Sequence, residues 1–499
     1  MKFKSILYTL LLSAFFYNCK EERQSQNEGG TPRFVAHWDS LAAYNEAPKW
    51  FKEGKFGIYA HWGVLSVPAY ANDWYPRNMH IEGTNENKHQ VKTYGDFSKF
   101  GYHDFVPMFN AKKFNPEAWA DLFKKSGAKF AGIVAEHHDG WSNWDSDINP
   151  WNAMDKGPKR DIVGELGKAI HKNNMKFVTS FHKARNLQIF QNDSTKWLDD
   201  TSYFPYNPKM PTSSEDSLLR IMYGNIPKEQ FYKNWLGELK EVINKYHPDL
   251  IYFDSKLDKI PNQYKCEFAA YYINESLARG QEVVITHKEG ELPKTVSLED
   301  FEKGRANKIK DEYWLTDETV TKGSWSYVEN LTYKTANDII DVLVDIVSKN
   351  GALMLNVSPM ANGTIPQEQQ DILLEVGEWL NTNGEAIYAS HPWQVFGEGP
   401  TKQEKSGMFL DWLTYTSGDV RYTQKDGVIY AIVMGVPEQD NIILSAFSKE
   451  NLKESIASIA ILGTNENIEF SLKEDGLHLK TPTQKVDDKA FVYKIELQK

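Results

Sequence analysis

The chain has 499 residues, of which 41% are hydrophobic and 25% charged, so it is long enough for one large enzyme core and a smaller second domain. The formal net charge is −11 and the acidic residues are spread along the chain, which excludes the basic surface that binding to a phosphate backbone requires. We therefore expect no nucleic-acid partner. Aromatic residues make up 13% of the chain, and aromatic planes outside a core are surfaces on which sugar rings or bases stack.

The N-terminus has the pattern of an export signal. Lys2 and Lys4 form a basic start, and residues 6–16 are an apolar run too short to span a membrane as a mature helix. Cys19 follows this run and precedes a polar, charged stretch. This arrangement resembles a bacterial lipoprotein signal, in which the cysteine becomes the lipidated N-terminus, and the charged residues resemble surface-export signals of Bacteroidetes-type bacteria.

We expect residues 1–18 to be a signal peptide and residues 19–32 to be a tether. The protein would then be exported to the periplasm or the cell surface. A lipid at Cys19, inserted in the outer membrane, would be its only contact with a membrane. A plain signal peptide without lipidation is the alternative.

From about Trp50 onward, short apolar strands alternate with amphipathic helices. The expected strands cover residues 55–60, 129–135, 176–181, 249–253, 282–286 and 353–357. The expected helices cover residues 115–126, 164–172, 231–246, 335–349 and 367–381. Repeated β-then-α units with apolar strands predict a parallel sheet that is buried on both faces.

Over roughly 340 residues this alternation favours a (β/α)8-like TIM barrel, which we place at residues 33–395, over an open doubly wound sheet. No glycine-rich phosphate loop follows any of the strands, which argues against a nucleotide-binding sheet.

The pattern changes after about Gln394, where the helical periodicity disappears. Short strands are expected at residues 427–433, 441–447, 455–462 and 490–497, separated by turn-rich stretches. Regularly spaced short strands predict an antiparallel β-sandwich, which we place at residues 396–499 as an accessory domain.

Cysteine and histidine spacing give no support for a metal site. Cys19 and Cys266 are the two cysteines, so a disulfide framework is excluded, and Cys266 is expected to be a half-buried free thiol. His137 and His138 would point in opposite directions on an extended chain, which makes them a poor chelating pair. We expect neither a metal nor another cofactor.

Polar residues directly follow several of the expected strands. His61 follows the first strand, residues 136–139 the second, His182 the third and Asp254 the fourth. In a barrel, side chains at the C-terminal strand ends build the reactive face. No serine or cysteine nucleophile motif is present, so carboxylates with aromatics remain, and a glycosidase needs one ionised and one protonated carboxyl group. Asp254 is the candidate nucleophile, and the acidic cluster 299–302 is the candidate source of the acid.

A series of segments in order along the chain resembles one enzyme family. The segments are 55–63, 72–75, 136–140, 159–165, 248–254, 353–359 and 383–388. Together they resemble the α-L-fucosidases of glycoside hydrolase family 29, and the likeness covers about residues 33–395. The resemblance implies a retaining exo-α-L-fucosidase, whose partner is a fucosylated oligosaccharide or glycoconjugate.

The resemblance also implies roles for individual residues. Asp254 matches the family's nucleophile, and Glu302 matches the acid/base, with Glu299 as the alternative. The positions that match contacts to the sugar are His61, Asp73, Trp74, His137, His138 and His182. Asp73 stands where the family usually has the longer Glu. Trp141 and Trp325 are expected to be apolar walls for the C5 methyl group of fucose, with packing in the core as the alternative.

Two other functions fit the same residues. One is a non-catalytic, glycan-binding lipoprotein built on a hydrolase scaffold. The other is a hydrolase of the related α-L-galactosides, because only the pocket for the methyl group separates the two sugars.

Overall fold

The computed structural model describes residues 33–44, 46–191, 193, 195, 202–447, 452, 455–483 and 488–498. The expected signal peptide and the tether, with Cys19, lie outside the described residues. Residues 34–499 form one compact unit. Within the described ranges, no helix has both the length and the apolar character that crossing a membrane requires.

Eight parallel strands form a barrel, in the order β6-β5-β4-β3-β2-β1-β10-β7. They are β1 (Phe56–Ala60), β2 (Phe130–Glu136), β3 (Lys176–Phe181), β4 (Leu250–Phe253), β5 (Val284–His287), β6 (Leu298–Glu299), β7 (Trp314–Thr319) and β10 (Gly351–Val357). A bridge between Asp300, directly after β6, and Leu315 of β7 closes the sheet on itself. The predicted TIM barrel is therefore confirmed.

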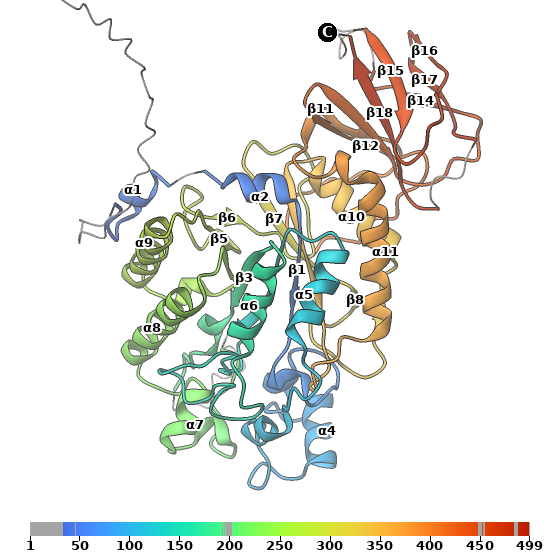
Figure 1. Ribbon diagram of the computed structural model, residues 1–499. Helices are drawn as coiled ribbons and strands as arrows, with labels where there is room; N and C mark the ends of the chain where they lie inside the picture. Colours follow the sequence, from blue (N-terminus) through green and yellow to red (C-terminus); the bar gives the residue numbers. More distant parts are fainter. Residues whose placement is uncertain are drawn as a thin grey trace, which may run out of the picture. The chain divides into compact units, whose positions relative to one another are not determined.

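Helices surround this barrel (Figure 1). They are α5 (Pro116–Lys125), α6 (Ile162–Lys172), α8 (Lys228–Tyr246), α9 (Asn262–Ala278), α10 (Ala336–Val347) and α11 (Gln367–Asn383). The connections before and after β6, all of whose residues are described, contain no helix, so the barrel departs there from strict alternation.

Shorter elements fill the loops. The short helices are α1 (Trp38–Leu41), α2 (Lys49–Gly54), α3 (Tyr75–Asn78), α4 (Asn85–Thr93) and α7 (Ser217–Met222). Short stretches of 3-10 helix lie at Val64–Ser66, Tyr102–Met108, Lys183–Asn186, Pro211–Ser213, Leu257–Lys259 and Gly384–Ala386. A small hairpin joins β8 (Thr321–Lys322) to β9 (Thr332–Tyr333).

Local sequence explains where α5 begins and ends. The side chain of Asn115 accepts a hydrogen bond from the N–H of Ala118, and Pro116 supplies a preset backbone angle at the first helical position. Gly127, with φ of +90°, follows the last turn. These are the boundaries that the sequence predicts for this helix.

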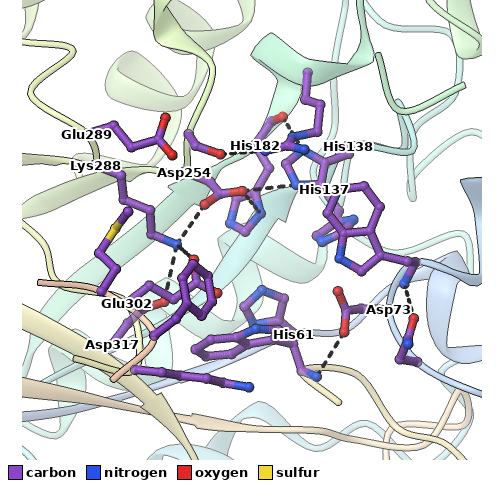
Figure 2. Close-up of a pocket in the computed structure, with 18 of the residues that line it drawn as sticks. His61, Asp73, His137, His138, His182, Asp254, Lys288, Glu289, Glu302 and Asp317 are labelled. Carbon is purple, nitrogen blue, oxygen red and sulfur yellow. Dashed lines mark hydrogen bonds and ion pairs between the residues drawn. The ribbon is translucent and has the colours of Figure 1, made fainter. Parts of the chain in front are cut away.

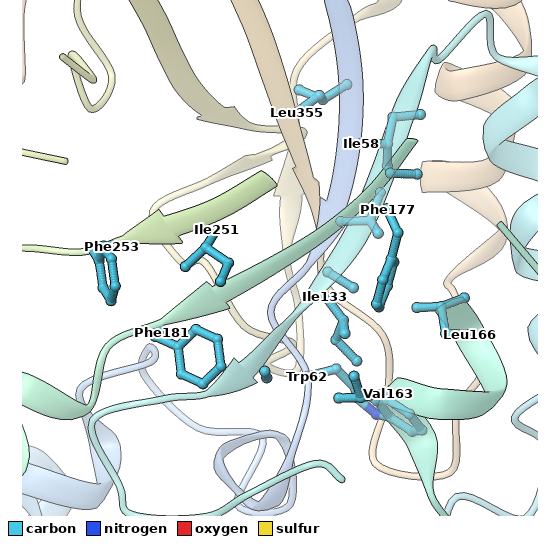
Figure 3. Packing of buried hydrophobic residues seen from close by; sticks show 14 of the residues in the cluster. Ile58, Trp62, Ile133, Val163, Leu166, Phe177, Phe181, Ile251, Phe253 and Leu355 are labelled. Atoms are coloured by element: carbon cyan, nitrogen blue, oxygen red, sulfur yellow. The ribbon is translucent and has the colours of Figure 1, made fainter. Parts of the chain in front are cut away.

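Alternate residues along each strand belong to two different cores. Ile58, Phe177 and Ile251 lie in the large cluster that also contains Val163 and Leu166 of α6, so this face of the strands packs against the helices (Figure 3). The residues in between form a second cluster inside the barrel, which includes Tyr59, Val134, Val178, Tyr252 and Met354. This period of two decides which side chains reach the end of the barrel.

The C-terminal part consists of two antiparallel sheets, as the sequence predicts. The first contains β11 (His391–Glu398), β12 (Val420–Lys425), β13 (Val428–Val433), β18 (Phe491–Leu497) and β15 (Ile456–Ile461). The second contains β14 (Asn441–Leu444), β17 (Gly476–Lys480) and β16 (Phe470–Lys473). Residues from both sheets, among them Tyr422 and Leu477, share one hydrophobic core.

Buried polar contacts join this part to the barrel helices. Nε of Arg421 in β12 lies 2.7 Å from Oδ1 of Asp345 in α10, and Lys349 lies 2.8 Å from the same carboxylate. The indole N–H of Trp379 in α11 donates to the carbonyl of Ala490 at 2.6 Å. Cys266 in α9 is a free cysteine and is buried, rather than half-buried as the sequence suggested.

Candidate active site

A cavity of about 280 Å³ lies at the C-terminal ends of the barrel strands. This volume is near the lower end of the roughly 300–1,000 Å³ that small-molecule pockets occupy. Most of the site residues expected from the sequence line it, namely His61, Asp73, Trp74, His137, His138, His182, Asp254, Glu302 and Trp325.

The alternation of the strands explains why these residues meet. Tyr252 of β4 belongs to the inner cluster and Phe253 to the outer one, so the next residue, Asp254, points inward again. The same alternation brings in His182 after Phe181 of β3. The strands β1, β3, β4 and β5 each deliver a side chain to the cavity at the residue that follows the strand, namely His61, His182, Asp254 and Lys288.

Glu302 and Glu299, the two candidates for the acid, have different surroundings. Leu298 packs against the inner cluster, so Glu299 points outward, where its carboxylate lies 3.0 Å from Lys294 and 3.3 Å from Lys310. Glu302 lies in the turn that follows β6, and its side chain lines the cavity. Of the two, only Glu302 faces the same space as Asp254.

Lys288 joins the two candidate catalytic carboxylates. Its Nζ lies 2.7 Å from Oδ1 of Asp254 and 2.6 Å from Oε2 of Glu302 (Figure 2). These two oxygens therefore lie no further apart than the sum of those distances. That limit agrees with the roughly 5–5.5 Å of retaining glycosidases and is shorter than the roughly 6.5–9.5 Å of inverting ones.

The two carboxyl groups have opposite pKa shifts. Burial alone would raise the pKa of Asp254, but Lys288 and the hydrogen bond from His138 outweigh burial and hold the pKa well below its usual range. Burial raises the pKa of Glu302 to about 7, with Asp317 adding to the rise and Lys288 opposing it. At neutral pH, one group is ionised and the other holds its proton in a large fraction of molecules.

A second layer of carboxyl groups lies beneath Lys288. Oδ2 of Asp317 is 3.7 Å from the lysine nitrogen and accepts a hydrogen bond from the hydroxyl of Tyr59 at 3.0 Å. Oδ1 of Asp300 accepts the backbone N–H of Asp317 at 2.9 Å. Burial, followed by the charge of Asp317, raises the pKa of Asp300 well above its usual range.

His137 and His138 lie side by side, and the prediction that they point in opposite directions is wrong. Their ring centroids are 4.5 Å apart and both rings line the cavity. The strand β2 ends at Glu136 and the chain then turns, because Ser142 pairs back with Glu136. The alternation of an extended chain therefore does not apply to these residues.

His138 connects two strand ends. Its Nε2 lies 3.0 Å from Oδ2 of Asp254, and its Nδ1 lies 2.7 Å from the carbonyl oxygen of His182. With both ring nitrogens engaged, the ring has a fixed orientation beside the carboxylate.

The other imidazoles are uncharged at neutral pH. Burial lowers the pKa of His61 to about 4, and it holds the pKa values of His137 and His182 well below their usual range. Nδ1 of His61 lies 2.8 Å from Oδ1 of Asn356. Within the described part of the chain, Nδ1 of His137 has no hydrogen-bond partner, and neither has Nδ1 of His182. A neutral imidazole can donate to one hydroxyl and accept from another, as sugar binding requires.

These imidazoles could also hold a metal ion. Ligand atoms of His61, His137 and His182 lie within 4.8 Å of one another, and so do those of His138, His182 and Asp254. Neutral imidazole suits zinc and copper. An ion bound there would fill the space that the sugar needs. The possible metal site is therefore part of the sugar site and not a separate site.

Asp73 and Trp325 form one wall of the cavity. Oδ1 of Asp73 accepts the backbone N–H of Trp325 at 3.1 Å, and burial raises the pKa of the Asp73 carboxyl group. The ring of Trp325 lies beside His61, with centroids 5.1 Å apart. Asp73 therefore reaches the cavity although its side chain is shorter than that of Glu.

Trp141 does not line the cavity, so its expected role as a wall for the sugar methyl is corrected. It is buried among core residues, its indole N–H donates to Asn143 at 3.0 Å, and its ring packs edge-on against Phe109. The turn after β2 that brings His137 and His138 into the cavity directs Trp141 away from it.

Several lining residues were not expected from the sequence. They are Asn72, Arg185, Ser255, Lys288, Glu289, Lys303, Asp317, Gly323, Met408 and Phe409. Lys288 follows β5 in the same way as Asp254 follows β4, but the strand expected at residues 282–286 ends one residue too early, so the rule of strand ends points to His287 instead. Met408 and Phe409 lie far along the chain, and no pattern near them points to the barrel.

A TIM barrel that presents two close carboxyl groups with opposite pKa shifts at its strand ends has the architecture of a glycoside hydrolase. A family model for α-L-fucosidase matches residues 20–385, and a model for the α-L-fucosidase C-terminal domain matches residues 414–496. The chain belongs to the α-L-fucosidase family, and its substrates are fucosylated glycans.

The chain is similar to known α-L-fucosidases over most of its length. Tissue α-L-fucosidase of Rattus norvegicus is 34% identical over 432 residues, covering 83% of this chain and 81% of the rat protein. Tissue α-L-fucosidase of Homo sapiens is 32% identical over 492 residues, covering 95% of this chain and 92% of the human one. The crystal structure of Thermotoga maritima α-fucosidase in complex with fucose matches with a TM-score of 0.72 at 27% identity, covering 93% of this chain and 100% of that one.

Proposed function

We propose that this α-L-fucosidase removes terminal α-L-fucose with retention of configuration, using Asp254 as the nucleophile and Glu302 as the acid/base. The observation that carries the proposal is the bridge by Lys288, which holds the two carboxyl groups within the distance that a retaining pair needs. Their opposite pKa shifts match the two roles, because the nucleophile must be ionised and the acid protonated.

The first step forms a covalent intermediate. An oxygen of Asp254 attacks the anomeric carbon of fucose, and the bond from this carbon to the glycosidic oxygen breaks. Glu302 gives its proton to that oxygen, so the rest of the glycan leaves as an alcohol. The fucosyl group is then bound to Asp254 as an ester, and Glu302 is ionised.

The second step reverses these roles. Glu302 takes a proton from a water molecule, whose oxygen attacks the anomeric carbon and releases Asp254. Fucose leaves with the configuration it had in the substrate, and Glu302 has regained its proton. Two inversions at one carbon give net retention.

The histidines and Asp73 bind the sugar before and during these steps. Nδ1 of His137 and Nδ1 of His182, which make no hydrogen bond to described residues, are available to its hydroxyl groups, and Trp325 offers an apolar face beside His61. The small volume of the cavity suits one terminal sugar, which is why we assign exo cleavage.

Release of fucose from a fucosylated oligosaccharide, followed by NMR, tests this function. We expect the wild-type protein to release α-L-fucose first, before mutarotation, and the variant Asp254→Gly to lose roughly a thousandfold or more in turnover. Binding of the glycan by the wild type without turnover would identify a non-catalytic glycan-binding protein instead. Immediate appearance of the β-anomer would show that hydrolysis proceeds with inversion and would contradict the proposed retaining mechanism.

We also propose that the protein is exported and carries a lipid at Cys19, which tethers the barrel to the outer membrane of the cell. The support is the basic and apolar run before this cysteine and the polar stretch after it. Fractionation of cells that produce the wild type or Cys19→Ser tests this. The wild type should be in the membrane fraction and the variant should not, and equal membrane fractions would contradict lipidation.

A further inference from the structure

A segment of the C-terminal part runs along the polypeptide that carries Glu302. Residues 404–410, which we name the strap, lie antiparallel to residues 302–307. Arg305 and Gly407 exchange two backbone hydrogen bonds, of 3.1 and 3.2 Å. The side chain of Asn307 donates to a strap carbonyl at 2.8 Å. The strap is therefore fixed to this part of the barrel by its backbone.

The sequence of the barrel permits this close approach. A Cβ atom at Gly304 would lie 1.9 Å from the carbonyl oxygen of Gly407, so any other residue at position 304 would push the strap away. The strap lies outside both family-model matches: the first match ends at residue 385 and the second begins at residue 414.

Phe409 is one of two strap residues that line the cavity, and Met408 is the other. The backbone N–H of Phe409 donates to the carbonyl oxygen of Glu302 at 2.8 Å, and its side chain lines the cavity. The side chain is nevertheless 64% exposed, which is unusual for a phenylalanine that could pack in a core. Its φ is +51°, a conformation that bulky residues rarely adopt and that has an energetic cost.

The reaction determines which part of the substrate lies at Phe409. Glu302 must deliver its proton to the glycosidic oxygen, so the sugar that departs with this oxygen lies on the side of Glu302. The backbone of Phe409 is hydrogen-bonded to the backbone of Glu302. The exposed ring of Phe409 is therefore available to the sugar on the side of Glu302. In the proposed function, the fucose itself is bound by the histidines, of which His138 lies beside Asp254.

We propose that the strap forms the subsite for the leaving group, and that Phe409 stacks on the ring of the sugar to which fucose is attached. This rests on the proposed function, because it takes Glu302 as the acid. An aromatic ring offers a flat apolar face that matches the C–H groups on one face of a pyranose. The proposed occupant is thus the pyranose next to the terminal fucose.

The test compares two substrates in the full-length protein. α-L-Fucosyl fluoride has no ring in its leaving group, whereas a fucosylated oligosaccharide has a pyranose there. In Phe409→Ala, we expect the ratio of kcat/KM for the oligosaccharide to kcat/KM for the fluoride to fall roughly three- to tenfold, the range of a lost aromatic contact. Phe409→Tyr keeps a ring and should keep most of the ratio.

Phe470→Ala is the matched control, since Phe470 is also exposed but lies on β16 and does not line the cavity. Its ratio should equal that of the wild type. An unchanged ratio in Phe409→Ala, or an equal loss for both substrates, would overturn the proposal for the strap. Failure of the wild type to hydrolyse either substrate would instead overturn the proposed function and, with it, the subsite.

Discussion

The ammonium nitrogen of Lys288 lies 2.6 Å from Oε2 of Glu302, the carboxyl group whose pKa burial raises to about 7. The same nitrogen lies 2.7 Å from Asp254, whose pKa is held well below its usual range. One cation thus contacts two carboxyl groups in opposite states. It favours the ionised form of each group. The two differ because His138 and His182 also favour the ionised form of Asp254, whereas the negative charges of Asp317 and Asp254 disfavour the ionised form of Glu302.

Removal of the charge of Lys288 should shift the pH dependence of kcat/KM upward. In Lys288→Met, the pKa values of Asp254 and Glu302 both rise, because each loses a neighbouring positive charge. The fall in rate on the acidic side and the fall on the basic side should therefore both move to higher pH. The pH profile of hydrolysis of an aryl fucoside, measured under kcat/KM conditions, checks this.

Lys288→Arg is the control for that change, because it keeps the positive charge. Its pH profile should stay closer to the wild type than that of Lys288→Met. Coincident profiles for the wild type and Lys288→Met would contradict the assigned role of the lysine.

The wild-type rate should decrease above a pH of about 7. Glu302 must be protonated to act as the acid, so kcat/KM declines as pH rises through the pKa of about 7. The decline at low pH, where Asp254 takes up a proton, should begin well below the usual titration range of an aspartate. If the decline of kcat/KM above a pH of about 7 is unchanged in Glu302→Gln, a group other than Glu302 causes that decline.

Loss of the Glu302 carboxyl group should depend on the leaving group. In Glu302→Ala, we expect kcat/KM for a fucosylated oligosaccharide to fall roughly 10²- to 10⁴-fold, whereas an aryl fucoside with a nitrophenolate leaving group, which needs little protonation, should lose far less. Azide should restore turnover of the aryl fucoside and yield fucosyl azide, because azide attacks the intermediate without a base.

Glu299→Ala is the matched control, since Glu299 points away from the cavity to Lys294 and Lys310. Its rates should resemble those of the wild type for both substrates. A larger loss in Glu299→Ala than in Glu302→Ala would transfer the acid/base role to Glu299.

Selectivity for fucose over galactose should depend on Trp325 and not on Trp141. Burial of one methyl group contributes roughly 1–3 kcal/mol to discrimination between substrates. We expect Trp325→Ala to lower the ratio of kcat/KM for an aryl α-L-fucoside to that for the α-L-galactoside by roughly tenfold or more. Trp141→Phe should leave this ratio unchanged but lower the melting temperature, because Trp141 is a buried core residue. A change of the ratio in Trp141→Phe alone would reverse the two assignments.

A transition metal should inhibit the enzyme by competing with fucose. Zinc bound by His61, His137 and His182 would occupy the sugar site. We expect zinc to raise the apparent KM for an aryl fucoside, and a chelator to leave the activity of the purified protein unchanged. Loss of activity on chelation, restored by zinc, would show that the metal takes part in the reaction.

The barrel and its main carboxyl groups are predictable from the sequence because both depend on a simple repeat. Apolar strands alternate with helices, and polar residues stand where several strands end. The inward position of Leu298 implies that Glu299, the next residue of the strand, points outward. The two-residue strand β6 itself is too short for any periodicity to reveal it.

Other features depend on contacts that a local pattern does not contain. The sequence shows little periodicity for α9, because its buried residues, such as Tyr264 and Cys266, lie on different sides of the helix. Turn geometry after β2 reverses the expectations for His137 and Trp141. Phe409 reaches the cavity through backbone pairing between segments about a hundred residues apart, which only the folded chain reveals.

Trapping of the covalent intermediate tests the central claim, the nucleophilic role of Asp254, most directly. A 2-deoxy-2-fluoro-fucosyl fluoride forms the ester, because fluoride leaves readily, and slows its hydrolysis, because the fluorine at C2 destabilises the cationic transition state. We expect the mass of the protein to rise by one fluorofucosyl group, and peptide fragmentation to locate that group on Asp254. A label on any other residue would contradict the assignment, and so would an absence of label while ordinary fucosides are hydrolysed with inversion.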